Sequence, residues 1–327
     1  MVTIALDPGY SSIKLVGVKG SETMQSAVSI CQGDSVGHMA GLRRSRRPLK
    51  IGISAGTFYV GDSAHGWGRP IENLDLDRLS GSPEMDALFL GALSQYGVPE
   101  EPIRLIVGLP IASLMGEQAT ATQRQVRRFL KGAHRWQENS TNREAEVEDV
   151  QVTSQPVGAM FDYLLDNEGH MSPAKRQVFR EEIGVCCIGL NTVELLVVQA
   201  GAPVHRFLGG RAVGVRRLLE LLNGNGLYSL AELDAQLRSR SLDLTTAQPI
   251  WQREVMGFLE HQWGTAYRRF ACIVTVGGGA MLLRDAMLAK FREKAFFPED
   301  PVLATARGLY KYGLMKARRR ESRGQDR

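Results

Sequence analysis

Apolar positions along this chain recur with two spacings, one typical of strands and one typical of helices. Residues 2–7 and 13–19 are apolar runs on either side of a Gly-containing turn, which predicts a β-hairpin. Residues 184–198 repeat that layout. From residue 83 onward the apolar positions fall on one face of a helix. Strand pairs that alternate with helices in this order predict an α/β fold.

The same patterns predict the remaining elements. Strands are expected at 24–31, 51–62 (two short ones), 103–109, 150–153, 203–208 and 272–276. Helices are expected at 120–131, 157–165, 213–222, 229–240, 250–270, 280–291 and 305–319. A flexible basic loop is expected at about 33–50, and a polar loop or hairpin tip at 137–146.

The two hairpins match each other without a gap at an offset of 180 positions, so that residues 6–15 correspond to residues 186–195. Each turn has a glycine followed by small hydroxyl or amide side chains, which brings backbone N–H groups close to phosphate oxygens. Repetition on this scale indicates a duplicated fold. We therefore expect one hairpin in each half, with both holding one polyphosphate. One position breaks the match, because Asp7 corresponds to Cys187.

The candidate phosphate-binding residues occupy the two turns and the strand ends beside them. They are Gly9, Tyr10, Ser11, Ser12 and Lys14 in the first hairpin and Gly189, Leu190, Asn191 and Thr192 in the second. The Lys14 ammonium group is placed to reach a phosphate as a point charge. The Asp7 carboxylate is placed to orient Mg²⁺ through water, since Mg²⁺ keeps several of its waters in proteins. For either turn taken alone, the alternative is an ordinary tight turn.

Three consecutive glycines follow the strand at 272–276 and precede a helix. Gly277, Gly278 and Gly279 allow a flat group to lie against the backbone, and the helix N-terminus favours an anion. We assign these glycines and Met281 to nucleotide binding. A G-x-G-x-x-G dinucleotide site is the alternative, but the third glycine is missing. No G-x-x-x-x-G-K-[ST] is present, which excludes a P-loop.

Gln155 stands where the strand at 150–153 leads into a helix. A glutamine at such a junction can orient a water molecule toward a γ-phosphate. The alternative is a polar residue that serves only the entry of the helix. We take Gln155 and Asp7 as the catalytic candidates.

In this order, the first hairpin, Gln155, the second hairpin and the triple glycine resemble the actin-like ATPase superfamily. They correspond to its phosphate-1, connect-1, phosphate-2 and adenosine motifs, and residues 301–310 resemble connect-2. Val-Gly-Leu-Pro at 107–110, Tyr-Val-Gly-Asp-Ser-Ala at 59–64 and Ala-Arg-Gly at 306–308 are similar to the ParM/StbA group of bacterial and archaeal actin-like proteins. The resemblance covers nearly the whole chain.

The resemblance implies two RNase-H-like domains with ATP, or GTP as the alternative, and Mg²⁺ in the cleft between them. Domain I would span 1–153 and be completed by the helix at 305–319, domain II would span 154–304, and 320–327 would be a disordered tail. It further implies ATP-dependent polar filaments that segregate plasmids or other DNA, joined to the DNA by a separate adaptor protein.

The chain departs from the family pattern at three positions. Cys187 stands where the phosphate-2 motif carries Asp, Glu194 where the family often has a second Asp, and Thr305 where connect-2 often has Asn. A thiol is a poor ligand for hard Mg²⁺. We therefore expect ATP hydrolysis to be slowed more than nucleotide binding is weakened.

Composition limits the class of protein. The chain has 327 residues, 43% of them hydrophobic, which is enough for two packed lobes. Its net charge of +5 is concentrated at 43–50 and 318–323, which argues against direct, specific nucleic-acid binding. No apolar run reaches the ~18 residues that span a bilayer and no secretory signal is present, so a cytoplasmic protein without a membrane partner is expected. The four cysteines lack ligand spacing and are expected to be small buried hydrophobes.

Three alternative functions remain open. A nucleotide-binding scaffold of the same fold that forms no filaments is favoured by Cys187. A sugar or acetate kinase would need a carboxylate base in the cleft, and the first acid after Gln155 is Asp162. An Hsp70-type chaperone would need a peptide-binding domain after residue 327. The basic cluster of Arg43, Arg44, Arg46, Arg47 and Lys50 is expected either in a mobile solvated loop or at a filament, adaptor or weak DNA contact.

Overall fold

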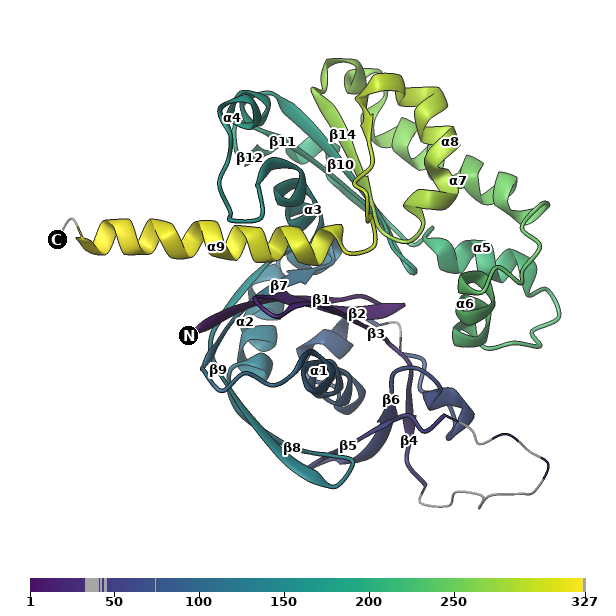
Figure 1. Cartoon of the computed structure of the whole chain (residues 1–327). Coiled ribbons are helices and arrows are strands. Elements are labelled where there is room, and N and C mark those ends of the chain that lie inside the picture. Colours follow the sequence, from purple (N-terminus) through teal and green to yellow (C-terminus); the bar gives the residue numbers. More distant parts are fainter. Residues whose placement is uncertain (33–40, 42, 44–45, 74, 326–327) are drawn as a thin grey trace.

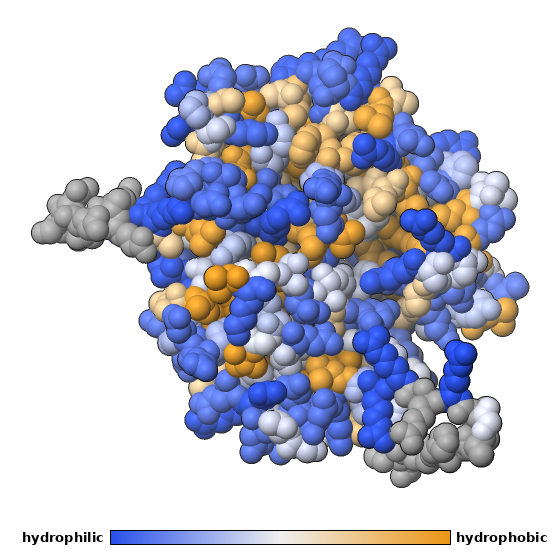
Figure 2. Space-filling view, viewed as in Figure 1, coloured by the Kyte–Doolittle hydropathy of each residue, from blue (hydrophilic) through white to orange (hydrophobic). Residues whose placement is uncertain are grey.

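The computed structural model describes residues 1–32, 41, 43, 46–73 and 75–325. Figure 1 shows two α/β lobes, with the long helix α9 (Ala304–Gln325) running along their junction. The outward surface of α9 is largely hydrophilic in that view (Figure 2). Among the described residues, no helix combines the length and apolar character needed to cross a membrane.

Lobe I is built on a mixed sheet of nine described strands. In sheet order they are β3 (Gly20–Gln25), β2 (Ser12–Gly17), β1 (Val2–Pro8), β7 (Ile103–Leu109), β9 (Thr141–Ser154), β8 (Gly132–Glu138), β5 (Leu49–Ile53), β6 (Gly56–Val60) and β4 (Val28–Ile30). Helix α1 (Pro83–Tyr96) packs its apolar residues on this sheet, and α2 (Ala119–Leu130) packs against β9. A 3-10 helix, η2 (Leu76–Ser80), contacts both α1 and α2.

Lobe II is built on a second sheet with helices on both sides. Its strands in order are β12 (Ala202–Pro203), β11 (Val193–Gln199), β10 (Glu182–Ile188), β14 (Cys272–Val276) and β15 (Ala295–Phe296), with β13 (Gly209–Arg211) paired to β11. Its helices are α3 (Gln155–Leu164), α4 (Pro173–Arg180), α5 (Val215–Leu222), α6 (Leu230–Arg238), α7 (Ala247–Trp263) and α8 (Ala280–Phe291). Trp251 and Trp263 of α7 are buried in the hydrophobic core that α5, α7 and α8 share with this sheet.

The two sheets share one arrangement at their centres. Strand β1 pairs antiparallel with β2 and parallel with β7. Strand β10 pairs antiparallel with β11 and parallel with β14. This common arrangement agrees with the duplication that the matching hairpins predicted. It also places each hairpin turn at the carboxyl end of a central strand.

Helices α3 and α9 form the junction between the lobes. A Cβ atom added at Gly308 would lie 1.9 Å from the carbonyl oxygen of Gly158, so only glycine allows the two helices to approach this closely. One turn further along, the Asp162 carboxylate accepts hydrogen bonds from Arg307 at 2.7 Å and from Lys311 at 2.9 Å. This ion cluster ties α3, which packs on the sheet of lobe II, to α9, which packs on β1 and β7 of lobe I.

Several predicted boundaries were wrong. The single strand expected at 24–31 is divided, because β3 ends at Gln25 and Ser26 turns away to donate to the carbonyl of Gly9 at 2.7 Å. The strand expected at 203–208 is instead two short strands, β12 and β13, around a 3-10 turn (His205–Phe207). Strand β9 is far longer than the predicted 150–153.

Two predictions concern the charged segments. The tail expected to be disordered at 320–327 continues helix α9 as far as Gln325. Of the basic loop expected at 33–50, residues 33–40, 42, 44 and 45 lie outside the described part of the chain. Strand β5 begins within the predicted loop, at Leu49.

Candidate functional site

A cavity of about 600 Å³ lies between the two lobes, within the size range of small-molecule sites. Every site residue that the sequence predicted lines it: Asp7, Gly9, Tyr10, Ser11, Ser12, Lys14, Gln155, Gly189, Leu190, Asn191, Thr192, Gly277, Gly278, Gly279 and Met281. These residues come from four separate turns of the chain. The fold therefore gathers both hairpins, the start of α3 and the triple glycine around one space.

The first hairpin carries a compensated ion pair. The β1–β2 register sets Asp7 opposite Lys14, and the Lys14 Nζ lies 3.1 Å from Oδ2 of Asp7. Gln155 Nε2 donates to the other carboxylate oxygen, Oδ1, at 2.7 Å. Gln155 is the first residue of α3, where the Ser154 side chain caps the helix by accepting from Val157 N. Asp7 and Gln155 are thus held together, with Gln155 oriented by the carboxylate.

The second hairpin has the same register but a different electrostatic character. Cys187 lies opposite Glu194, and both side chains are buried. Burial raises the pKa of the Cys187 thiol well above its usual range, so the thiol is neutral. Burial also raises the pKa of Glu194 to about 7, although hydrogen bonds from Ile111 N and the Thr192 hydroxyl oppose the shift. The Ile111 N–H lies 3.1 Å from both carboxylate oxygens and links β7 of lobe I to this site.

The carboxylates of Asp7 and Glu194 suit a divalent cation better than the thiol does. The negative charge of Asp7 contributes to the raised pKa of Glu194, so the two acids interact across the cavity. Oxygen donors of this kind are what Mg²⁺ prefers, and a cation near both would relieve their repulsion. Asp7 and Glu194 therefore fit Mg²⁺, whereas Cys187 does not.

The triple glycine shows which residues the fold requires and which it does not. A Cβ atom at Gly277 would lie 2.3 Å from the Ile188 carbonyl oxygen, and one at Gly279 would lie 2.3 Å from Ile188 Cγ2. Gly277 also has a positive φ of 93°. A Cβ atom at Gly278 would meet nothing within 4 Å, although Gly278 lines the cavity. Packing thus explains the glycines at 277 and 279, while the glycine at 278 leaves the cavity wall flat.

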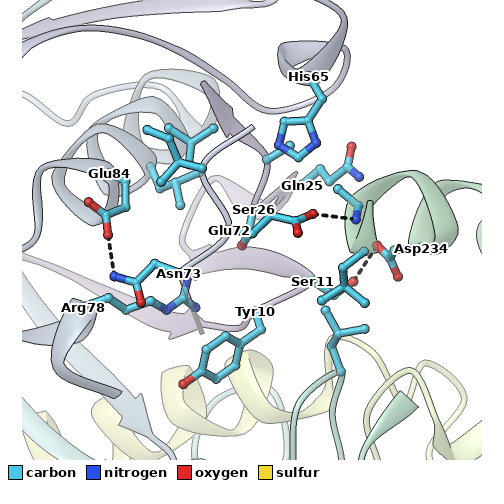
Figure 3. Close-up of a pocket in the computed structure, with 17 residues that line it drawn as sticks. Tyr10, Ser11, Gln25, Ser26, His65, Glu72, Asn73, Arg78, Glu84 and Asp234 are labelled. Atoms are coloured by element: carbon cyan, nitrogen blue, oxygen red, sulfur yellow. Dashed lines mark hydrogen bonds between the residues drawn. The ribbon is translucent and has the colours of Figure 1, made fainter. Parts of the chain in front are cut away.

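Helix α6 supplies two polar residues that sequence reasoning missed. The Ser11 hydroxyl donates to Asp234 Oδ2 at 3.0 Å, and Arg238 donates to the Ser11 carbonyl at 3.1 Å and to the Ser11 hydroxyl at 2.5 Å. Figure 3 shows Ser11 and Asp234 pointing toward one another from opposite lobes. Asp234 and Arg238 also pair with each other at helical i,i+4 spacing. That spacing was the available signal, but it is more typical of a solvated helix face.

Leucine side chains form an apolar part of the cavity beyond the turns. Leu237, Leu242, Leu244 and Leu282 line it together with Met281. The cavity therefore has a polar end at the hairpins and an apolar end beside the triple glycine. This division suits a ligand with a charged chain and a flat apolar ring.

Comparisons with known proteins agree with this geometry. Residues 5–158 match the family model described as the actin like proteins N terminal domain. No curated protein sequence matches the chain. Among solved structures, the actin-like protein Alp7A has a TM-score of 0.75 at 15% identity, covering 99% of both chains.

Two further structures are similar over most of their length. The archaeal actin homologue Ta0583 in complex with ADP has a TM-score of 0.73 at 18% identity, covering 98% of this chain and 100% of that chain. The subunit of a 15-stranded ParM filament from Clostridium botulinum has a TM-score of 0.69 at 17% identity, covering 95% and 98%. The chain therefore has the fold of the actin-like proteins, and residues 5–158 match their N-terminal domain.

Proposed function

We propose that this protein binds ATP with Mg²⁺ between its lobes and assembles into filaments. One observation carries the proposal. Two matching hairpins, one from each lobe, meet a flat glycine wall around a single cavity, and the packing of the fold does not require the glycine at 278. The ADP complex of the archaeal actin homologue supports nucleotide binding by a protein of this fold. GTP is the alternative nucleotide.

Some residues of the cleft would bind the phosphates, and others would take part in hydrolysis. The turn amides and the hydroxyls of Ser12 and Thr192 would donate to phosphate oxygens, and Lys14 would supply positive charge. Asp7 and Glu194 would hold Mg²⁺ through its waters, and the ion would neutralise charge on the phosphates. Gln155, oriented by Asp7, would position the attacking water.

We further propose that hydrolysis is slow. The neutral thiol of Cys187 cannot orient Mg²⁺ as a carboxylate would, and Glu194 is only partly ionised near neutral pH. The phosphate donors of both hairpins are retained. The arrangement therefore favours nucleotide binding over turnover.

The biological setting proposed here rests on the fold. The similar ParM subunit from Clostridium botulinum forms a filament, which supports self-association of this chain. We propose a cytoplasmic role in segregating plasmids or other DNA, through a DNA-bound adaptor. We also propose that the boundary between domains I and II lies at residues 153/154 and that α9 completes domain I.

A nucleotide-binding scaffold without filaments is the second candidate, and the Cys187 substitution favours it. A sugar or acetate kinase is disfavoured, because Asp162 is held by Arg307 and Lys311 and is not free to act as a base. High-speed pelleting and electron microscopy with ATP distinguish the first two. Filaments are expected with ATP, and their absence despite ATP binding would favour the scaffold.

A matched pair of glycine variants tests nucleotide binding itself. Gly278→Val should abolish calorimetric ATP binding without changing the thermal unfolding temperature, because its side chain would enter the cavity and not the core. Gly224→Val is the control, since a Cβ atom there also meets nothing within 4 Å and the residue lies outside the cavity. Equal ATP affinity for the two variants would contradict the proposal.

A further inference from the structure

Arg78 is a buried charged residue that neither the sequence motifs nor the cavity between the lobes explains. It lies in η2 of lobe I and is only 5% exposed. Its guanidinium carbon lies 4.1 Å from the centroid of the Tyr10 ring, and its Nη2 donates to the carbonyl of Pro8 at 3.3 Å. Figure 3 shows Arg78 and Tyr10 side by side. Both contacts are therefore to the turn of the first hairpin.

The positive charge of Arg78 has no close counter-charge among the described side chains. No described carboxylate lies within the 4.0 Å that defines an ion pair with it, and its Nε has no hydrogen-bond partner there. Glu84 acts on it at longer range and itself accepts a hydrogen bond from Asn73 at 2.7 Å. A buried cation without a paired anion among the described residues is costly for a fold, so this position calls for a reason other than stability.

The location of Arg78 supplies that reason. Its two contacts, Pro8 and Tyr10, flank Gly9, so the guanidinium supports the phosphate-1 turn from the side away from the large cavity. Arg78 itself does not line that cavity, but it lines a smaller one of about 50 Å³ behind the turn. A polyphosphate on the opposite side of the turn would supply a negative charge, and charges attract more strongly in a low-dielectric interior than in water.

We propose that Arg78 is a positioning residue that holds the phosphate-1 turn in shape and favours ligands in proportion to their negative charge. The inference rests on the proposed nucleotide site. Arg78 contacts no ligand directly in this account. It acts through Pro8 and Tyr10 and through its charge.

The test compares ligands of different charge. For Arg78→Gln, the affinity for ATP should fall at least tenfold, for ADP less, for AMP least, and for adenosine not at all. Arg78→Lys keeps the charge but loses the planar stack on Tyr10, so it should lose only part of the ATP affinity. Calorimetry or fluorescence competition measures each affinity.

A second variant is expected to strengthen the effect of the Arg78 charge on ATP binding, whereas Arg78→Gln removes it. Glu84→Gln removes the carboxylate that acts on Arg78 but keeps an acceptor for Asn73. It should tighten ATP binding a few-fold and leave adenosine unchanged. Glu84→Gln therefore tests whether the charge of Arg78 affects ATP affinity even if Arg78→Gln does not fold.

The outcomes separate this inference from the proposed function. An equal loss for ATP and adenosine in Arg78→Gln would show a purely structural role and overturn the inference, as would unchanged ATP affinity in both charge-altering variants. If the unmodified protein binds no ATP, the proposed nucleotide site fails as well. If it binds ATP and the ranking by charge is absent, only the role of Arg78 fails.

Discussion

The two hairpins have the same backbone register but carry different charges. In lobe I, the end of β1 places Asp7 opposite Lys14, and the pair is neutral as a whole. In lobe II, the end of β10 places Cys187 opposite Glu194, an acid with no cation beside it among the described residues. The shape that cradles phosphate is thus duplicated, while the charges beside it are not.

The second hairpin carries its carboxylate on a different strand from the first. The end of β10 has the thiol of Cys187, and Glu194 presents an acid from the neighbouring strand β11. The acid is held by the Ile111 N–H from lobe I, so it also joins the lobes. Each hairpin thus presents one carboxylate to the cleft, and the pKa of the one in the second hairpin is raised.

The largest expected effect comes from breaking the first hairpin at Asp7. Asp7→Asn keeps an oxygen for the Gln155 amide but removes the charge that pairs with Lys14 and suits Mg²⁺. Hydrolysis should fall about 10³-fold, as for loss of one stabilising group in an active site. Single-turnover phosphate release measures the rate, and calorimetry checks that ATP still binds. A rate within threefold of the original would contradict the assigned role.

The second effect isolates the buried acid of the second hairpin. Because the folded-state pKa of Glu194 is raised from 4.5 to about 7, the folded protein binds this proton more tightly than the unfolded chain. The destabilisation caused by ionising the buried Glu194 carboxyl is absent below pH 4.5 and grows as the pH rises to about 7. Glu194→Gln should therefore stabilise the protein by up to about 3 kcal/mol at pH 8 and by almost nothing at pH 4.5.

Chemical denaturation across this pH range measures the gain. Glu220→Gln is the matched control, because the Glu220 carboxylate lies on an exposed part of α5. It should show no gain that grows with pH. A gain for Glu194→Gln that is the same at both pH values would contradict the raised pKa.

The third effect comes from moving the carboxylate of the second hairpin to position 187, where the family resemblance implies an Asp. Cys187→Asp places an acid at the end of β10, and adding Glu194→Gln removes the neighbouring like charge. The double variant should hydrolyse ATP about tenfold faster, since one well-placed carboxylate then takes the metal-orienting position. Cys187→Ser is the control and should give no increase. An unchanged rate in the double variant would show that Cys187 does not limit hydrolysis.

The smallest expected effect concerns the contact of α6 with the first hairpin. Arg238→Gln removes the bonds to Ser11 that bridge the lobes, so bound nucleotide should be released a few-fold faster. Arg216→Gln is the control, because Arg216, like Arg238, forms an i,i+4 ion pair within its own helix, and its pair with Glu220 stays within lobe II. Displacement of a fluorescent nucleotide measures both rates. Equal rates would show that this bridge does not govern release.

Local patterns made most of the fold and the hairpin positions predictable. Strand alternation located β1, β2, β10 and β11, and helical spacing located α8 with the predicted bounds. The glycines and small polar residues of the turns also predicted which residues line the cavity, because the residues of each turn are consecutive in the sequence.

Contacts between residues far apart in the sequence could not be predicted from local patterns. Ser11 and Asp234 are 223 positions apart, and no local pattern pairs them. Arg78 looks like an exposed charge until packing around Tyr10 buries it. The role of Glu194 depends on the Ile111 N–H from the other lobe, which only the assembled fold brings near.

Calorimetric titration of MgATP into matched hairpin variants tests whether both hairpins hold one nucleotide. Ser12→Ala removes a hydroxyl from the first hairpin and Thr192→Ala one from the second. We expect one ATP per chain, with a loss of affinity of about tenfold for each single variant and a larger loss for the double variant. Absence of saturable binding, or a variant in either hairpin that leaves the affinity unchanged, would contradict it.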